Sequence, residues 1–192
     1  MKTLLISAAL AASVLVPSAA SAQGIPAAVI AVVDLETVTR TCNACRTAQA
    51  ALQSQATAEQ TREKALATPL QTEQQSIQAS VDALKGKEPD AALKARIDSF
   101  QTRFQQAQEE ANRGRQQLEA NKTYIQKQIQ EKLNPIYQQV MQRRGANLLL
   151  ETGATLATSS SIEVTNDVTA ALNAALPTIA TTAPAQQQPQ GR

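Results

Sequence analysis

The chain has 192 residues and a formal net charge of +2, with no histidine, no tryptophan, four aromatic side chains and 25 glutamines. Without histidine it can form neither a Ser–His–Asp nor a Cys–His nucleophile arrangement, and it offers no imidazole to a metal. Its six glycines form no phosphate-binding array of the G-x-x-x-x-G-K or G-x-G-x-x-G type. We therefore expect no enzyme, no cofactor and no metal site, so the shape of the molecule becomes the main clue to its function.

The first residues have the pattern of an export signal. Lys2 supplies a positive charge, residues 3–16 are almost wholly apolar or small, and Ala20-Ser21-Ala22 matches the A-x-A cleavage pattern. The apolar run is too short for a membrane anchor, which is the alternative interpretation. The sequence predicts a signal peptide over residues 1–22, cleaved near Ala22/Gln23, and an exported soluble protein.

A strand and then a long helix are predicted next. Residues 29–33 are a β-branched run of strand length, and Asp34 is a favourable helix N-cap. From Leu35 to Leu84, steps of alternately three and four residues define fifteen seam positions, ten of which are apolar. Lys85-Gly86 then supplies a basic last turn and a C′ glycine, which ends the helix.

A second helix of matching length is predicted to begin after Glu88-Pro89-Asp90 and to end at Arg143-Arg144-Gly145. Two long helices joined by a short turn near residues 86–90 should lie antiparallel. Residues 35–144 are therefore expected to form a coiled-coil helical hairpin, here called the arm. Pro69 and Pro135 should kink it.

After the arm, β structure is expected to return. Residues 147–151 and 154–158 are predicted strands around a Thr152-Gly153 turn, and a short helix should follow from Thr165 to Pro177. Residues 23–34 and 145–176 would then meet as a β-rich base. Such a base, with about 40 residues, lies at the limit of independent folding, so we expect self-association through it. Residues 177–192 have few apolar anchors and are predicted to be a disordered tail.

The predicted fold class is therefore α+β, mostly α, with a long antiparallel coiled-coil hairpin projecting from a small β oligomerisation base. This order of elements resembles the Skp/OmpH family of periplasmic outer-membrane-protein chaperones. The segments that carry the resemblance are Ile30-Ala31-Val32-Val33-Asp34, Ala146-Asn147-Leu148-Leu149-Leu150 and Glu163-Val164-Thr165-Asn166-Asp167-Val168. The resemblance covers about residues 28–176 of the chain.

The resemblance implies a homotrimer in the periplasm whose three arms enclose a cavity. That cavity would hold unfolded outer-membrane β-barrel proteins without ATP and prevent their aggregation. The alternative is a structural or adaptor coiled-coil protein of the cell envelope, without a client cavity. We expect client contact at the apolar arm positions Leu66, Leu70, Ile77, Leu84, Leu93, Ile97, Phe100 and Phe104.

The charge distribution suggests a second contact. Residues 86–150 carry 11 basic and 7 acidic side chains, a net charge of +4, which could attract acidic clients and anionic lipid or lipopolysaccharide headgroups. The alternative is an ordinary solvated helix face. Candidates for a weak lipid contact are Lys122, Lys127, Lys132, Arg143 and Arg144. Nucleic acid is not expected as a partner, because the protein is exported and its mature part is nearly neutral.

Cys42 and Cys45 form a C-x-x-C pair early in the first helix. One interpretation is redox chemistry, because a thiol near a helix N-terminus can have a lowered pKa. Both cysteines also fall on the apolar seam, and the chain has no thioredoxin-like pattern. We therefore favour a structural disulfide or a pair of small buried thiols.

Overall fold

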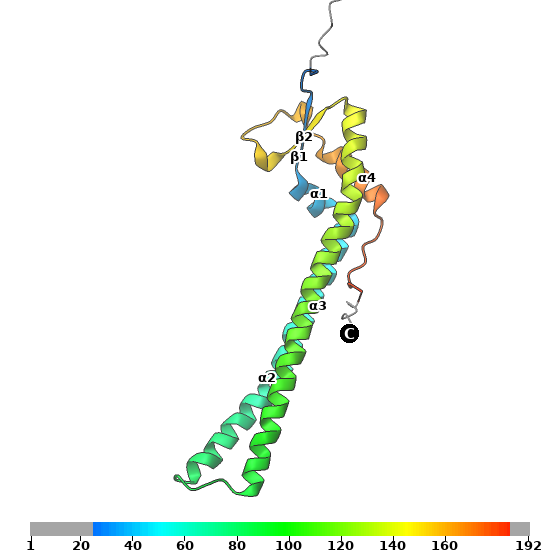
Figure 1. Ribbon diagram of the computed structural model, residues 1–192. Helices are drawn as coiled ribbons and strands as arrows, with labels where there is room; N and C mark the ends of the chain where they lie inside the picture. The colour runs from blue at the N-terminus through cyan, green and yellow to red at the C-terminus, as the bar shows by residue number, and fades with distance from the viewer. Residues whose placement is uncertain (1–24, 185–192) are drawn as a thin grey trace, which may run out of the picture.

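The computed structural model describes residues 25–184, in which two long helices form an arm and the remaining elements gather at one end of it (Figure 1). The predicted signal peptide lies outside the described residues. The predicted fold class is confirmed: the chain is mostly helical, with a long helical hairpin and a small sheet. The elements are, in order, β1 (Ile30–Val33), α1 (Leu35–Thr41), α2 (Asn43–Ala83), α3 (Ala91–Arg144), β2 (Leu148–Glu151) and α4 (Thr165–Ala175).

The arm consists of α2 and α3, which have 41 and 54 residues and are therefore about 60 and 80 Å long. Asp90 caps the start of α3, where its carboxylate accepts a hydrogen bond from the Leu93 N–H at 2.8 Å. Gly145 ends α3 in the left-handed conformation, with φ of 66°. The distal part of α2 diverges from α3 toward the tip (Figure 1). Pro69 lies inside α2, where its ring removes one backbone hydrogen bond.

The first predicted helix is divided in two. Cys42 has φ of −58° and ψ of 128°, which is outside the helical region, so α1 ends at Thr41 and α2 begins at Asn43. Asp34 caps α1 by accepting hydrogen bonds from the Thr37 N–H at 2.8 Å and the Thr37 hydroxyl at 2.7 Å. These bonds, the backbone one above all, hold the pKa of Asp34 below its usual value.

The sheet of the base is a parallel pair. Ile30 of β1 is paired with Leu148 of β2, and the register continues to Val33 and Glu151. A single bridge joins Val32 to Glu163. The predicted strand over residues 154–158 is wrong: 3₁₀ turns occupy residues 152–154 and 160–162, and Leu156 is fully exposed.

The core lies where the sheet, α1, the first turns of α2, the last third of α3 and α4 converge. Val38, Val140, Val168 and Leu172 each have 0% of their surface exposed. One chain thus buries a compact apolar cluster without a neighbour. Its remaining members are Ala31, Val33, Cys42, Ala44, Cys45, Leu133, Ile136, Val164 and Leu176.

The described part of the C-terminal segment differs from the prediction of a disordered tail. Residues 177–184 leave α4 and run beside α3 toward the tip (Figure 1). Ile179 packs against the core, and side-chain amides of the arm hydrogen-bond to the segment's main chain. The segment itself has few apolar side chains to hold it in place, but hydrogen bonds from polar side chains of the arm do so. Residues 185–192 lie outside the described residues.

Candidate functional site

The eight apolar candidates lie along the seam between the two helices of the arm. Seven are half-buried, and Phe104 is exposed, with 43% of its surface accessible. The rings of Phe100 and Phe104 stack with centroids 6.0 Å apart. Leu66, Leu70 and Phe104 line one shallow groove of about 210 Å³, and Leu84 and Leu93 line another of about 350 Å³ near the tip. The seam therefore brings the candidates together along its length rather than into one pocket.

The arm beyond the base has no fully buried side chain. Every residue from 49 to 120 keeps part of its surface accessible, and Asn121 is the first buried residue of α3. Two helices alone cannot enclose a seam between them, so its apolar atoms are shared between the facing helix and solvent. Such a surface offers many shallow apolar contacts to a further chain and encloses no ligand.

Ion pairs connect α2 to α3 along this open seam. Glu73 of α2 contacts Arg96 at 3.6 Å and also pairs with Arg103, while Glu63 lies 3.4 Å from Arg115. The arginines are 40 to 61% exposed, so each pair contributes at most about 1 kcal/mol. These pairs therefore add little to the stability of the hairpin.

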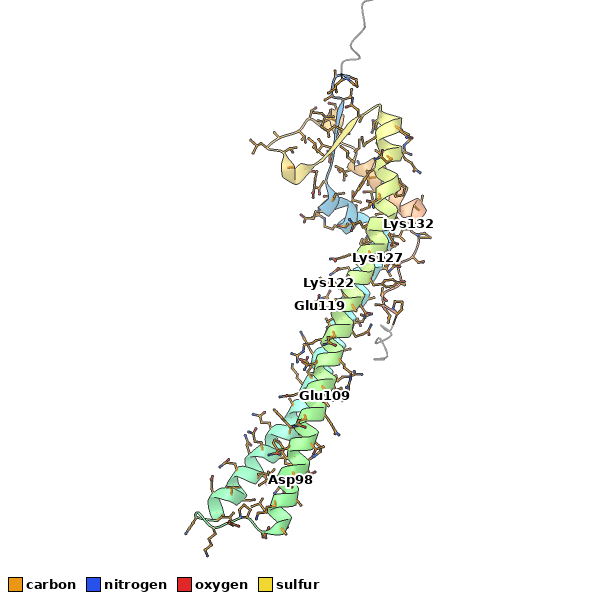
Figure 2. All side chains as sticks on the ribbon, in the orientation of Figure 1. Asp98, Glu109, Glu119, Lys122, Lys127 and Lys132 are labelled. Carbon is orange, nitrogen blue, oxygen red and sulfur yellow. A yellow bond between two sulfur atoms is a disulfide. The ribbon has the colours of Figure 1, made fainter. Side chains whose placement is uncertain are left out.

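The five basic candidates are exposed, but three of them are already paired. Lys122 lies 3.8 Å from Glu119, Lys127 lies 3.8 Å from Glu131, and Arg144 lies 2.7 Å from Asp167 of α4. Lys132 and Arg143 have no ion pair among the described residues. Figure 2 shows Lys122, Lys127 and Lys132 spread along the base-proximal part of α3. Their charge is distributed along the helix rather than focused at one point.

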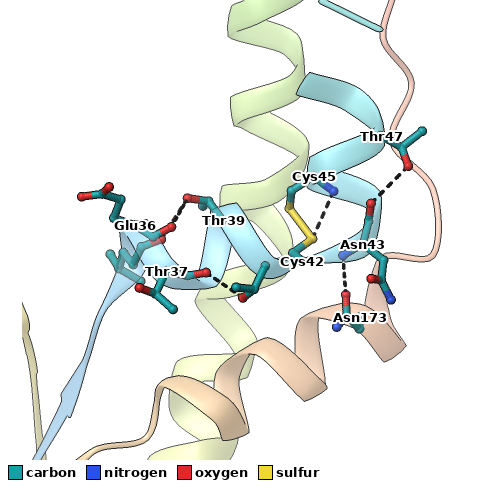
Figure 3. The surroundings of a disulfide bond; sticks show 10 residues. Glu36, Thr37, Thr39, Cys42, Asn43, Cys45, Thr47 and Asn173 are labelled. Atoms are coloured by element: carbon teal, nitrogen blue, oxygen red, sulfur yellow. Dashed lines mark hydrogen bonds between the residues drawn. A yellow bond between two sulfur atoms is a disulfide. The ribbon is translucent and has the colours of Figure 1, made fainter. Parts of the chain in front are cut away.

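Cys42 and Cys45 are joined by a disulfide at the break between α1 and α2 (Figure 3). Both are buried in the core, and the Cys42 sulfur accepts a hydrogen bond from the Cys45 N–H at 3.2 Å. Asn173 of α4 accepts from the Asn43 N–H at 2.8 Å, so the start of α2 is anchored to α4 (Figure 3). The position of the disulfide in the core favours a structural role.

Sequence reasoning missed a groove of about 760 Å³ where the arm meets the base. Its lining includes three basic residues, Arg40, Arg46 and Lys122, and the apolar residues Ile125 and Ile129. Arg40 and Arg46 are separated from Lys122 by most of the arm in sequence. These three residues come together only when the hairpin is folded. The charge pattern of neighbouring residues in the sequence therefore does not indicate the groove.

Sequence reasoning also missed a cluster of side-chain amides on the arm. Asn121 is buried, with 5% of its surface exposed, and donates to Gln55 Oε1 at 2.8 Å. Gln117 donates to Asn121 Oδ1 at 2.8 Å. The available signal was the position of Asn121, a polar residue on the apolar track between Leu118 and Ile125.

The described residues include neither a membrane-spanning helix nor a cluster of metal ligands. Across residues 25–184, no helix combines the length and the apolar character that a membrane crossing needs. The same part of the chain holds no group of three or more Cys, Asp or Glu residues placed to bind a metal ion.

Comparison with known proteins relates the chain to one family model and to solved structures. The family model described as outer membrane protein (OmpH-like) matches residues 29–172. The crystal structure of a candidate OmpH-like outer membrane chaperone from Caulobacter crescentus CB15 superposes with a TM-score of 0.69 at 20% sequence identity. That similarity covers 86% of this chain and 96% of the other, and at this identity it shows a shared fold. No curated protein matches the chain.

Proposed function

This chain belongs to the OmpH-like family, and we propose that it is a chaperone that holds unfolded outer-membrane β-barrel proteins in the periplasm without ATP. The observation that carries the proposal is the arm, a hairpin whose apolar seam remains half-exposed over residues 49–120. Unfolded β-barrel chains expose apolar side chains of many shapes. A long shallow surface suits such clients better than a deep pocket does.

Client contact is proposed at the seam candidates, of which Phe104 is the most accessible. Each contact is weak, because each side chain is already partly covered by the facing helix. Many such contacts along an arm nevertheless add up when a client lies along it. The proposed binding is therefore distributed, and no single residue is expected to carry it.

We propose that the base assembles into a homotrimer, so that three arms surround a cavity. A two-stranded sheet is marginal by itself, and the base leaves apolar side chains accessible around its strands. Val29, Ile30 and Leu148 are 39 to 49% exposed, and Ile25 and Leu156 are almost completely exposed. Contact between neighbouring bases would cover this apolar surface. Light scattering coupled to size-exclusion chromatography tests the assembly, and a stable monomer at micromolar concentration would contradict it.

A weaker contact of the basic candidates with anionic lipid or lipopolysaccharide headgroups remains part of the proposal. Lys132 and Arg143 are the best placed, because the other three already contact acidic side chains. Binding to anionic vesicles should fall steeply with added salt if this contact exists.

Aggregation suppression tests the main proposal. An unfolded β-barrel protein is diluted from denaturant into buffer with or without the chaperone, and light scattering is followed. We expect suppressed scattering, with a clear loss in a Leu70→Ser, Phe104→Ser variant and little change in a Gln71→Ser, Gln105→Ser control, whose replaced side chains are exposed. Scattering equal to that of the client alone would defeat the holdase proposal and favour an adaptor of the envelope.

A further inference from the structure

The C-terminal segment of residues 179–183 lies along the arm without helix or strand, and five hydrogen bonds hold its main chain there. Gln128 of α3 donates from Nε2 to the Ala180 carbonyl oxygen at 2.8 Å and accepts at Oε1 from the Ala180 N–H at 3.0 Å. This is the paired hydrogen bonding that an edge strand would give to one residue. A single glutamine side chain thus binds one residue of the segment at both of its backbone groups.

Three further amide contacts continue along the segment. Gln55 of α2 donates to the Thr181 carbonyl oxygen at 3.2 Å. Asn121 Oδ1 accepts a hydrogen bond from the Ala183 N–H at 2.8 Å, and Gln117 Nε2 donates one to the Ala183 carbonyl oxygen at 3.4 Å. We call Gln55, Gln117, Asn121 and Gln128 the amide track. Each of these five contacts uses a main-chain group of the segment and no side chain.

Three members of the track are also hydrogen-bonded to one another within the arm. Asn121 is buried and bonded to both Gln55 and Gln117, so α2 and α3 fix its orientation together. Gln117, Asn121 and Gln128 are four and seven residues apart along α3, which places them on one face of the helix. A pre-oriented row of donors and acceptors loses little side-chain entropy when it binds a chain.

The track has the chemistry to bind any extended polypeptide. The segment that occupies it is Ile-Ala-Thr-Thr-Ala, and its side chains contribute none of these hydrogen bonds. Every unfolded protein carries the same unpaired N–H and C=O groups. The five hydrogen bonds use only such groups, and the Ile179 side chain adds one apolar contact with the core. Because the hydrogen bonds do not depend on side chains, the track tolerates many sequences.

We propose that the amide track is a binding site for the extended main chain of an unfolded polypeptide, and that residues 177–184 occupy it as an intramolecular competitor. The proposal rests on the proposed chaperone function and names one place where a client is held. Because the segment is tethered to α4, its local concentration at the track is high, and a client must displace it. The competitor therefore lowers the affinity for weak clients by the fraction of time for which the track is occupied.

The test compares three forms of the protein, which end at Arg192, at Pro184 and at Leu176. All three forms retain Leu176, which in the full chain packs in the core and donates a hydrogen bond to the Leu172 carbonyl oxygen at 2.8 Å. The probe is a fluorescently labelled outer-membrane β-barrel protein diluted from urea, and its dissociation constant is measured by anisotropy. We expect at least about fivefold tighter binding when the chain ends at Leu176, and no change when it ends at Pro184.

Two variants of the form that ends at Leu176 then test the track itself. Gln128→Ala should cancel most of the gain, whereas Gln130→Ala, at an exposed position of the same helix, should keep it. Circular dichroism and size-exclusion chromatography establish that each form is folded and assembled alike. Equal affinity of the three forms, or a gain that survives Gln128→Ala, overturns the proposal.

The same measurements separate this proposal from the proposed function. If all three forms bind the probe and suppress its aggregation equally, the chaperone function stands and the competitor is refuted. If no form binds the probe, the chaperone function fails, and the competitor proposal falls with it.

Discussion

Gly114 lies in the middle of α3, where it leaves space for a carboxylate from the facing helix. A Cβ atom at this position would lie 1.8 Å from Oε1 and 2.2 Å from Cδ of Glu59, which is closer than any side chain tolerates. The Glu59 side chain is 15% exposed, and its Oε1 is buried without a hydrogen-bond partner. Replacing Gly114 by alanine must therefore push the Glu59 carboxylate aside.

The two effects of Gly114→Ala oppose each other. Alanine favours a helix over glycine by about 1 kcal/mol. Displacing Glu59 removes its packing in the seam but returns its carboxylate to water, because the clashing atoms are the end of a flexible side chain. We therefore expect Gly114→Ala to be nearly neutral in the natural chain. In a Glu59→Ala background the clash is absent, and the free energy of unfolding should rise by the full value of about 1 kcal/mol.

A double-mutant cycle measures this difference. The natural chain, both single variants and the double variant are unfolded in urea at one protein concentration and followed by circular dichroism at 222 nm. We expect a coupling free energy of about 0.5–1 kcal/mol between the two positions. If Gly114→Ala raises the free energy of unfolding equally in both backgrounds, to within about 0.3 kcal/mol, the steric argument is refuted.

Three further predictions concern the base. Leu172→Ala, at a core position with no exposed surface, should lower the free energy of unfolding by about 2–5 kcal/mol, whereas exposed Ala174→Ser should leave urea unfolding almost unchanged. Replacing Cys42 and Cys45 together by serine should cost about 2 kcal/mol, the loop-closure entropy of so short a ring, and thermal unfolding with and without reductant should then coincide. The pKa of Asp34 is lowered in the folded protein, so the stabilising contribution of its carboxylate is present above about pH 4 and is lost as the pH falls. Asp34→Ala should therefore have a lower free energy of unfolding than the natural chain at pH 7. If this difference persisted unchanged at pH 2, it would count against this account.

The sequence predicted the arm well because its signals are local and repeated. The apolar residues recur with the helical period over more than a hundred residues, and Asp34 and Gly145 mark helix ends by their own backbone and capping preferences. Its failures are of another kind. The break between α1 and α2 at Cys42 is not marked in the sequence by a proline or glycine. It is determined by the packing of Cys42 in the core. The predicted strand at residues 154–158 rested on composition, but Leu156 there packs against nothing.

Apart from Asn121, the amide track could not be predicted, because its residues make contacts with residues far away in the sequence. Glutamine is abundant on the arm, and no local pattern separates Gln128 from its neighbours. Gln128 is hydrogen-bonded to Ala180, which lies 52 positions away, and Gln55 is hydrogen-bonded to Thr181, which lies 126 positions away. The predicted disorder of residues 177–184 followed from their own composition, whereas their conformation is set by the surface on which they lie.

The parallel pairing of β1 with β2 has a consequence for the order of folding. Ile30 of β1 is paired with Leu148 of β2, which follows the last helix of the arm, so β1 remains unpaired until the whole arm has been synthesised. Closing a flexible loop of that length costs about 4 kcal/mol of chain entropy. Once α2 and α3 have folded against each other, only a few residues at each end remain to be closed. The arm should therefore fold first and act as the template that brings the two strands together.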